Sequence, residues 1–173
     1  MAVKVVTLAT ITNADADAVR SIWNQTRTAL GAFYPGGINQ LTNRNQAKAL
    51  LQRLTLRLWL DNTNTVHGLL LTQPLDVGSA PAEQATVLFP RPSISPTLFD
   101  LVCKELLEHW FNDCIARGVP HCWGVYPKTT PPLMLSVFNR MASVNGAVAT
   151  EHNALMMRWV ITPEQGLLGL TAL

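Results

Sequence analysis

The sequence has little charge. Only 14% of its 173 residues are Asp, Glu, Lys or Arg, against about a quarter in an average soluble protein. The formal net charge of +2 argues against a strongly electrostatic nucleic-acid binder. Asn, Gln and Thr supply much of the remaining polarity, and neutral amides and hydroxyls cost less to bury than ions do. The composition therefore favours a surface that can be covered by a protein partner.

Cysteine and long apolar runs are also scarce. The cysteines Cys103, Cys114 and Cys122 form no CxxC pair, and their odd number argues against a disulfide framework. This pattern predicts a reducing, intracellular location. No run approaches about 18 uninterrupted apolar residues, the length that a membrane-spanning helix needs. Residues 1–12 alternate in polarity instead of forming a continuous apolar core, so no signal peptide is expected.

Several familiar site motifs are missing. The sequence contains no P-loop, HExxH or GxSxG pattern, and its four histidines show no metal-ligand spacing, so no metal site is predicted. His121 and Cys122 are adjacent, and neighbours on a strand point to opposite faces, which argues against a Cys-His catalytic pair. Cys103 and Cys114 fall on one face of a helix and are expected in the core.

The elements that are present predict one α+β domain. Periodicity, caps and breakers predict strands over residues 3–11, 56–60, 66–72, 85–89, 122–126 and 155–161. They predict helices that begin near residues 12–13, 43, 95–96 and 131 and end near residues 31, 54, 118 and 144. Pro74, Gly78 and Pro81 indicate a loop over residues 73–84. No linker divides the chain, so we expect residues 1–162 to form the domain and residues 163–173 an apolar tail.

This order of strand, two helices, three strands, helix, strand, helix and strand resembles the GNAT superfamily of acyl-CoA N-acyltransferases. The segment SVFNRMASVNGA at residues 136–147 also resembles the last helix and closing turn of that family, and a strand follows it. The resemblance covers nearly the whole chain. It implies a mixed central sheet of about six to seven strands, flanked by about four helices.

The resemblance also implies a place for acetyl-CoA. In the family, the pantetheine arm pairs with the fourth strand, which is 85–89 here and ends at Phe89. The pyrophosphate sits on a Q/R-x-x-G-x-G/A loop at the start of the next helix, where backbone N–H groups receive it. Arg91 matches the first position of that loop, whereas Ile94 and Pro96 replace the two glycines. The hydroxyl groups of Ser93 and Ser95 can replace some of the hydrogen bonds that backbone N–H groups donate in the family's loop. If CoA binds, the implied cofactor residues are Phe89, Arg91, Ser93 and Ser95. A plain Ser-Pro helix start explains the last of these without a ligand.

The catalytic groups of the family are harder to place. Many members use a Tyr in the last helix to protonate the leaving thiolate, and a carboxylate or water near the fourth strand to accept a proton. Residues 131–144 contain no Tyr. The nearest candidates are Tyr126, at the end of the fifth strand, and Glu83, expected in the loop before the fourth strand.

Three functional hypotheses follow. The first is a GNAT-fold protein without efficient acyl transfer that serves as a binding or assembly subunit, for example in a viral particle. Its apolar tail is too costly to leave in water, at about 1.5–3 kcal/mol for each leucine, so the tail docks on its own domain or on a neighbouring subunit. The tail leucines are Leu167, Leu168, Leu170 and Leu173. The alternative is a divergent acetyl-CoA-dependent N-acetyltransferase. The second alternative is a nucleic-acid-associated module, which rests on a modest basic surface formed by Arg44, Lys48, Arg53 and Arg57.

Overall fold

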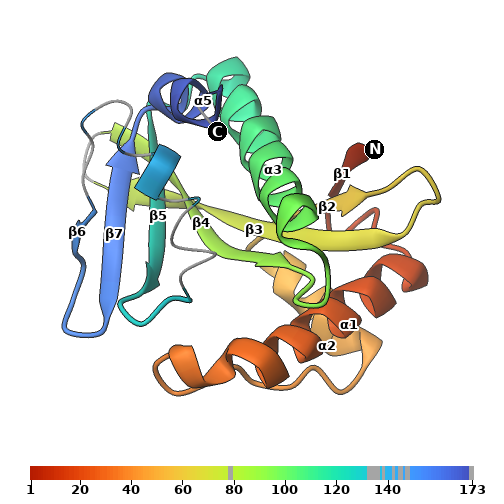
Figure 1. Cartoon of the computed structure of the whole chain (residues 1–173). Coiled ribbons are helices and arrows are strands. Elements are labelled where there is room, and N and C mark those ends of the chain that lie inside the picture. Colours follow the sequence, from red (N-terminus) through yellow and green to blue (C-terminus); the bar gives the residue numbers. More distant parts are fainter. Residues whose placement is uncertain are drawn as a thin grey trace.

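The computed structural model describes residues 1–77, 80–131, 137, 139–141, 143, 146 and 149–171. Within them the chain forms a seven-stranded mixed sheet in the order β1-β2-β3-β4-β5-β7-β6 (Figure 1). The strands are β1 (Ala2–Val6), β2 (Thr55–Leu60), β3 (Val66–Val77), β4 (Ala80–Pro90), β5 (His121–Pro127), β6 (Thr150–Glu151) and β7 (Met156–Ile161). Strands β4 and β5 run parallel, and the other neighbouring pairs run antiparallel. The predicted α+β class and mixed sheet are confirmed.

Helices cover both faces of this sheet. They are α1 (Asn13–Leu30), α2 (Arg44–Ala49), α3 (Pro96–Arg117) and α5 (Pro163–Thr171), with 3-10 turns at Gly31–Phe33 and Leu50–Gln52. Helices α1 and α2 lie under one face, and α3 and α5 lie on the other (Figure 1). Side chains alternate along β3, so that Leu69 and Leu71 pack in the core on the α1 side whereas Leu70 packs in the core on the α3 side.

Local signals fix the ends of the long helices as predicted. Thr12 and Asp15 form a capping box at the start of α1. Ser95 caps α3 by accepting a hydrogen bond from the backbone N–H of Leu98 at 3.2 Å, and Pro96 follows at the first helical position. Gly118 ends α3 in the left-handed conformation, with φ of 71°.

The loop expected over residues 73–84 is wrong. Strands β3 and β4 continue through most of this segment as a hairpin, and Pro74 pairs with Glu83 while Pro81 pairs with Asp76. The last β2–β3 pair is Thr55 with Thr72, and β4 pairs with β5 from Ala82 onward. Both prolines therefore lie where the hairpin extends beyond its flanking strands, and an edge tolerates a residue without an N–H.

Strand boundaries differ from the prediction at two further places. Strand β1 ends at Val6 instead of continuing to Ile11, because the chain turns there and the N–H of Ile11 donates to the carbonyl of Thr7 at 2.9 Å. The short strand β6, which pairs with β7, was not predicted. The helix expected from residue 131 to residue 144 falls mostly outside the described residues, as does half of the family-like segment 136–147.

The apolar C-terminal segment docks on its own domain. Residues 163–171 form α5, which packs against α3 (Figure 1). A Cβ on Gly166 would collide with the ring of Phe111, so glycine permits this close approach. Leu170 is 1% exposed and Leu167 packs against the same core, whereas Leu168 remains 55% exposed. Association of copies through Leu168 stays a prediction, and Leu173 lies outside the described residues.

None of the helices in the described part of the chain combines the length and the apolar character that crossing a membrane requires.

Candidate functional site

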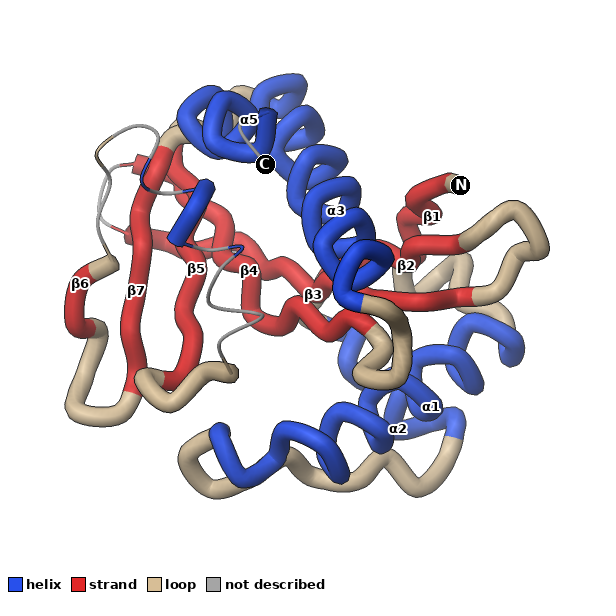
Figure 2. Tube along the Cα trace, viewed as in Figure 1, coloured by secondary structure: helices blue, strands red, loops and turns tan. Residues whose placement is uncertain are grey.

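A cavity opens where two parallel strands separate. Strands β4 and β5 pair from Ala82 with His121 to Ala85 with Gly124, and they diverge beyond that point (Figure 2). A cavity of about 320 Å³ lies in the opening. Among the described residues, no strand pairs with the β4 backbone beyond Ala85 on the side of β5, so these backbone groups can bind another molecule. The cavity is lined by Trp23, Tyr34, Gly37, Ile38, Asn39, Ala85, Thr86, Val87, Leu88, Phe89, Gly124, Val125, Tyr126 and Met156.

A β-bulge lies at the edge of this cavity. Leu71 of β3 pairs with Val87, and Thr72 pairs with Ala85, so Thr86 is an extra residue in β4. A bulge bends its strand and re-aims its side chain. The hydroxyl of Thr86 is buried and has no hydrogen-bond partner among the described residues. Such a group is costly unless a water or ligand pairs with it, so the bulge offers a polar contact inside an otherwise apolar wall.

Aromatic side chains from α1 and from the segment after it close one side of the cavity. The ring of Phe89 meets Trp23 at a centroid distance of 5.3 Å and Tyr34 at 6.0 Å, both edge to face. The indole N–H of Trp23 donates to the carbonyl of Asn39 at 2.7 Å, which ties α1 to the segment that leads to α2. Phe89, predicted from the resemblance as a cofactor residue, is buried between these rings and lines the cavity.

Two phenols line the cavity. Tyr126, the candidate acid from the sequence, lies near the end of β5, is almost fully buried in the core on the α3 side, and is one of the residues that line the cavity. Burial raises the pKa of Tyr126 above its usual value. Tyr34 was not singled out from the sequence as a site residue, and desolvation raises its pKa to about 12. Both phenols therefore stay protonated and neutral near pH 7, as a proton donor must.

The predicted phosphate residues lie together in the turn between β4 and α3, but two of them make contacts within the protein. The guanidinium of Arg91 donates to the carbonyl of Val66 at 2.9 Å, and to the side chains of Ser21 and Gln25 at 3.0 Å each. The Ser95 hydroxyl caps α3. Ser93 is exposed. The turn therefore offers a diphosphate an exposed hydroxyl and the start of a helix, whereas its cation already binds α1 and β3.

Glu83 lies away from the cavity. Its expected position in a loop is wrong, since it belongs to β4, where it is 6% exposed. Its carboxylate accepts a hydrogen bond from the indole N–H of Trp110 at 2.9 Å and pairs with Arg117 at 2.8 Å. Both partners belong to α3, which covers the face opposite α1. Glu83 therefore holds α3 on the sheet and is not placed to accept a proton in the cavity.

Arg57, assigned from the sequence to a basic surface, is instead buried. It is 1% exposed, and it donates to Asp113 at 2.7 Å and to Nδ1 of His109 at 3.2 Å, both on α3. The alternation of β2 contains the missed signal, because Leu56 and Leu58 occupy the opposite face. The sequence near Arg57 does not indicate that its counter-ion, Asp113, lies on a helix more than fifty residues later.

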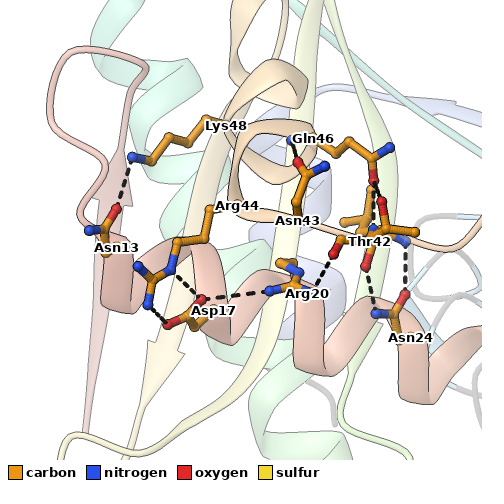
Figure 3. Close-up of polar contacts among 10 residues, drawn as sticks. Asn13, Asp17, Arg20, Asn24, Thr42, Asn43, Arg44, Gln46 and Lys48 are labelled. Carbon is orange, nitrogen blue, oxygen red and sulfur yellow. Dashed lines mark hydrogen bonds and ion pairs between the residues drawn. The ribbon is translucent and has the colours of Figure 1, made fainter.

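The remaining basic surface near α2 is partly neutralised. Arg44 makes a bidentate contact with Asp17 of α1, with both distances 2.9 Å, and Lys48 donates to Asn13 at 3.0 Å (Figure 3). These contacts use two of the four cations on which the nucleic-acid hypothesis rested, and a third, Arg57, is buried. They join α1 to α2 on the side of the sheet where Trp23 and Tyr34 pack around Phe89, the aromatic wall of the cavity.

The three cysteines are buried free thiols. Burial raises the pKa of Cys103, and hydrogen bonding to Cys114 together with burial raises the pKa of Cys122. A buried protonated thiol is a poor nucleophile. The expectation that Cys103 and Cys114 belong to the core is confirmed.

Neither a protein-family model nor a curated protein sequence matches the chain. Solved structures do. A ribosomal-protein-alanine N-acetyltransferase from Brucella melitensis matches with a TM-score of 0.64 and 13% identity, over 94% of this chain and 99% of that one. An aminoglycoside 6'-N-acetyltransferase from Enterococcus faecium matches with a TM-score of 0.64 and 10% identity, over 94% and 97%. The NatC complex bound to Gag peptide and CoA matches with a TM-score of 0.58 and 9% identity, over 94% and 99%. At such identities the similarity concerns the fold alone.

Proposed function

Because the chain has the fold of the GNAT acyl-CoA N-acyltransferases, we propose that it is a divergent N-acyltransferase that takes its acyl group from acetyl-CoA. The observation that supports this most is the cavity between β4 and β5, which is lined both by β4 beyond its last described pair with β5 and by Tyr126. This favours the sequence-based alternative over the assembly subunit. An assembly subunit has no need of a cavity with polar groups at its edge at this point of the sheet.

The residues of the cavity fit the pantetheine arm of the donor. An extended chain that carries amides can pair with an open strand edge, as peptides do in β-augmentation. Beyond Ala85, β4 presents such an edge toward the cavity. The hydroxyl of Thr86, which has no hydrogen-bond partner in the described part of the chain, adds a polar contact at the bulge. A volume of about 320 Å³ lies within the range of small-molecule sites, about 300–1,000 Å³.

The chain's own groups can assist acyl transfer in two ways. When bound, acetyl-CoA would supply an acyl group activated as a thioester. The backbone N–H groups of β4 near the bulge at Thr86 can stabilise the carbonyl oxygen as it gains negative charge. The phenol of Tyr126, kept protonated by burial, can hold the proton that the departing sulfur takes up. Aromatic side chains from α1 and residues 34–39 exclude water from that point.

The test is acetyl-CoA binding by calorimetry, together with thiol release in the presence of amines. We expect binding, and we expect Tyr126→Phe to lower kcat by about a hundredfold, the usual effect of losing a general acid, with little change in affinity. Val125→Trp, which fills the cavity from β5, should abolish binding. Matched unfolding curves must show that both variants are folded. Folded protein that binds no acetyl-CoA would contradict the proposal.

A further inference from the structure

The cavity is lined entirely by residues that are uncharged near neutral pH. Its two ionisable groups, Tyr34 and Tyr126, have raised pKa values because they are desolvated. Of the other buried charges, Glu83 and Arg57 bind side chains of α3, and Arg91 binds α1 and β3. Arg158, which pairs with the lining residue Val125, lies over the ring of Trp123 and adds a cation beside the cavity, not a carboxylate. The residues outside the described part of the chain include no Asp, Glu, His, Lys, Arg, Cys or Tyr, so their side chains add no charge either.

A neutral cavity discriminates between amines by their protonation. An alkyl amine such as a lysine side chain has a pKa of about 10.4, so only about one molecule in a few thousand is neutral and nucleophilic at pH 7. Its ammonium form would enter without a carboxylate to pair with, and burying an unpaired charge is costly. A weakly basic amine is already neutral at pH 7. It needs neither a counter-ion nor a base before it reacts.

The walls of the cavity add a second criterion, which is shape. Trp23 and Tyr34 both present ring edges or faces around Phe89, and Tyr126 lies across the opening on β5. Aromatic groups pack well against such walls in offset or edge-to-face arrangements. Since the donor arm is expected along β4, the side formed by α1 and residues 34–39 remains for the acceptor.

We propose that the acceptor is an aromatic amine or aryl hydrazine that is uncharged at neutral pH, an inference that rests on the acyltransferase function proposed above. The amine nitrogen forms the new C–N bond as the thioester C–S bond breaks. The nitrogen loses one proton to water, and the sulfur gains one from Tyr126, which water then reprotonates, so atoms and charge balance. No side-chain base is needed, because the incoming nitrogen carries no extra proton.

A matched pair of acceptors tests this inference. Phenylhydrazine and benzylamine are similar in size, but the first is neutral and the second cationic at pH 7. Thiol release from acetyl-CoA should give a kcat/KM at least about tenfold higher for phenylhydrazine. That value should stay flat between pH 6 and pH 9, whereas the value for benzylamine should rise about tenfold for each pH unit, as its neutral fraction does.

An isosteric variant tests the same cause from the side of the protein. Asn39 lines the cavity and is exposed to solvent, and its contact with Trp23 uses the backbone carbonyl. Asn39→Asp should therefore add a counter-charge without disturbing that contact, and should raise the kcat/KM for benzylamine about tenfold relative to phenylhydrazine. Asn45→Asp, at an exposed position on α2, is the control and should leave the ratio unchanged.

The outcomes separate this inference from the proposed function. If acetyl-CoA does not bind, the acyltransferase function fails and the inference fails with it. If acetyl-CoA binds but benzylamine is the better acceptor, or neither amine is acylated, the acceptor class is overturned while donor binding stands. If Asn39→Asp leaves the ratio of the two amines unchanged, the charge of the cavity does not set the preference, and the inference is likewise overturned.

Discussion

Gly124 and Trp159 face each other across β5 and β7, and the indole of Trp159 occupies the space that a Cβ on Gly124 would need. On its other side Gly124 pairs with Ala85, in the last pair before β4 and β5 diverge. Trp159 is almost fully buried in the core under α3. Because Gly124 has no side chain, the ring of Trp159 can pack directly beneath the point where β4 and β5 begin to separate.

Gly124→Ala should accordingly destabilise the protein. The added methyl group collides with a packed ring, and overpacking a core costs about 1–3 kcal/mol of unfolding free energy. Gly31→Ala is the matched control, because nothing lies within 4 Å of a Cβ at Gly31 and its φ is −57°. That variant should be neutral or slightly stabilised. Urea unfolding of both variants measures the difference. Equal midpoints would contradict the prediction and would mean that β5 shifts away from Trp159 to make room for the methyl group.

The buried ion pair between Arg57 and Asp113 provides a second prediction. Removing the carboxylate leaves a buried guanidinium without its closest charge, and breaking such pairs costs about 3–5 kcal/mol. Asp113 is 36% exposed in its side chain, so we expect Asp113→Ala to lie near about 3 kcal/mol. Asp17→Ala breaks the exposed pair with Arg44 and should cost much less, because solvent screens an exposed ion pair. If the two variants lose similar amounts of unfolding free energy in urea, the prediction is contradicted. Water would then solvate the guanidinium of Arg57 once Asp113 is removed.

The occupied guanidinium of Arg91 provides a third prediction, which concerns the donor. Since Arg91 already donates to Val66, Ser21 and Gln25, a diphosphate gains little from it. Acetyl-CoA and the truncated thioester S-acetyl-N-acetylcysteamine should then differ by about tenfold or less in kcat/KM, which corresponds to about 1.4 kcal/mol. Arg91→Ala should lower the midpoint of urea unfolding and leave the KM for acetyl-CoA nearly unchanged. A preference of a thousandfold for acetyl-CoA, abolished in Arg91→Ala, would show that this side chain turns to the cofactor.

The parts of the fold that the sequence predicts well depend on neighbours in the chain. The capping box of Thr12 with Asp15, and the start and end of α3 at Ser95 and Gly118, each involve residues a few positions apart. The hairpin through Pro74 and Pro81 was missed because proline is acceptable there only where the flanking strands end. The lengths of β2 and β5 decide that, and no local pattern reports them.

The candidate site shows the same division. Tyr126 was selected because it stands at the end of a strand, and it is among the residues that line the cavity. Arg91 was selected from a loop pattern, but its side-chain partner Ser21 lies 70 residues away. Glu83 binds Trp110, which is 27 residues away. Chemistry-bearing residues could be selected from the sequence, whereas the partners that decide their roles come from elements brought together by the fold.

Alkaline pH provides the last prediction, through Tyr34. Desolvation against Phe89 and the cavity wall raises the pKa of Tyr34 to about 12, whereas an unfolded tyrosine ionises near pH 10. Between these values the folded state holds more protons than the unfolded state, so the unfolding free energy falls as pH rises from about 10 to about 12. Below about pH 10 both states keep the proton, and the contribution of Tyr34 is constant.

Tyr34→Phe keeps the ring against Phe89 but removes this titration. Its unfolding free energy should therefore fall less steeply than that of the unaltered protein between pH 10 and pH 11.5, while the two proteins differ by a constant amount between pH 7 and pH 9. Lysines and the remaining tyrosine titrate in both proteins, so they cancel in the difference. Urea unfolding across this range, with the tyrosinate absorbance recorded in parallel, measures both quantities. Parallel stability profiles up to pH 11.5 would mean that water reaches the Tyr34 hydroxyl, and that the aromatic wall of the cavity is more open than its packing indicates.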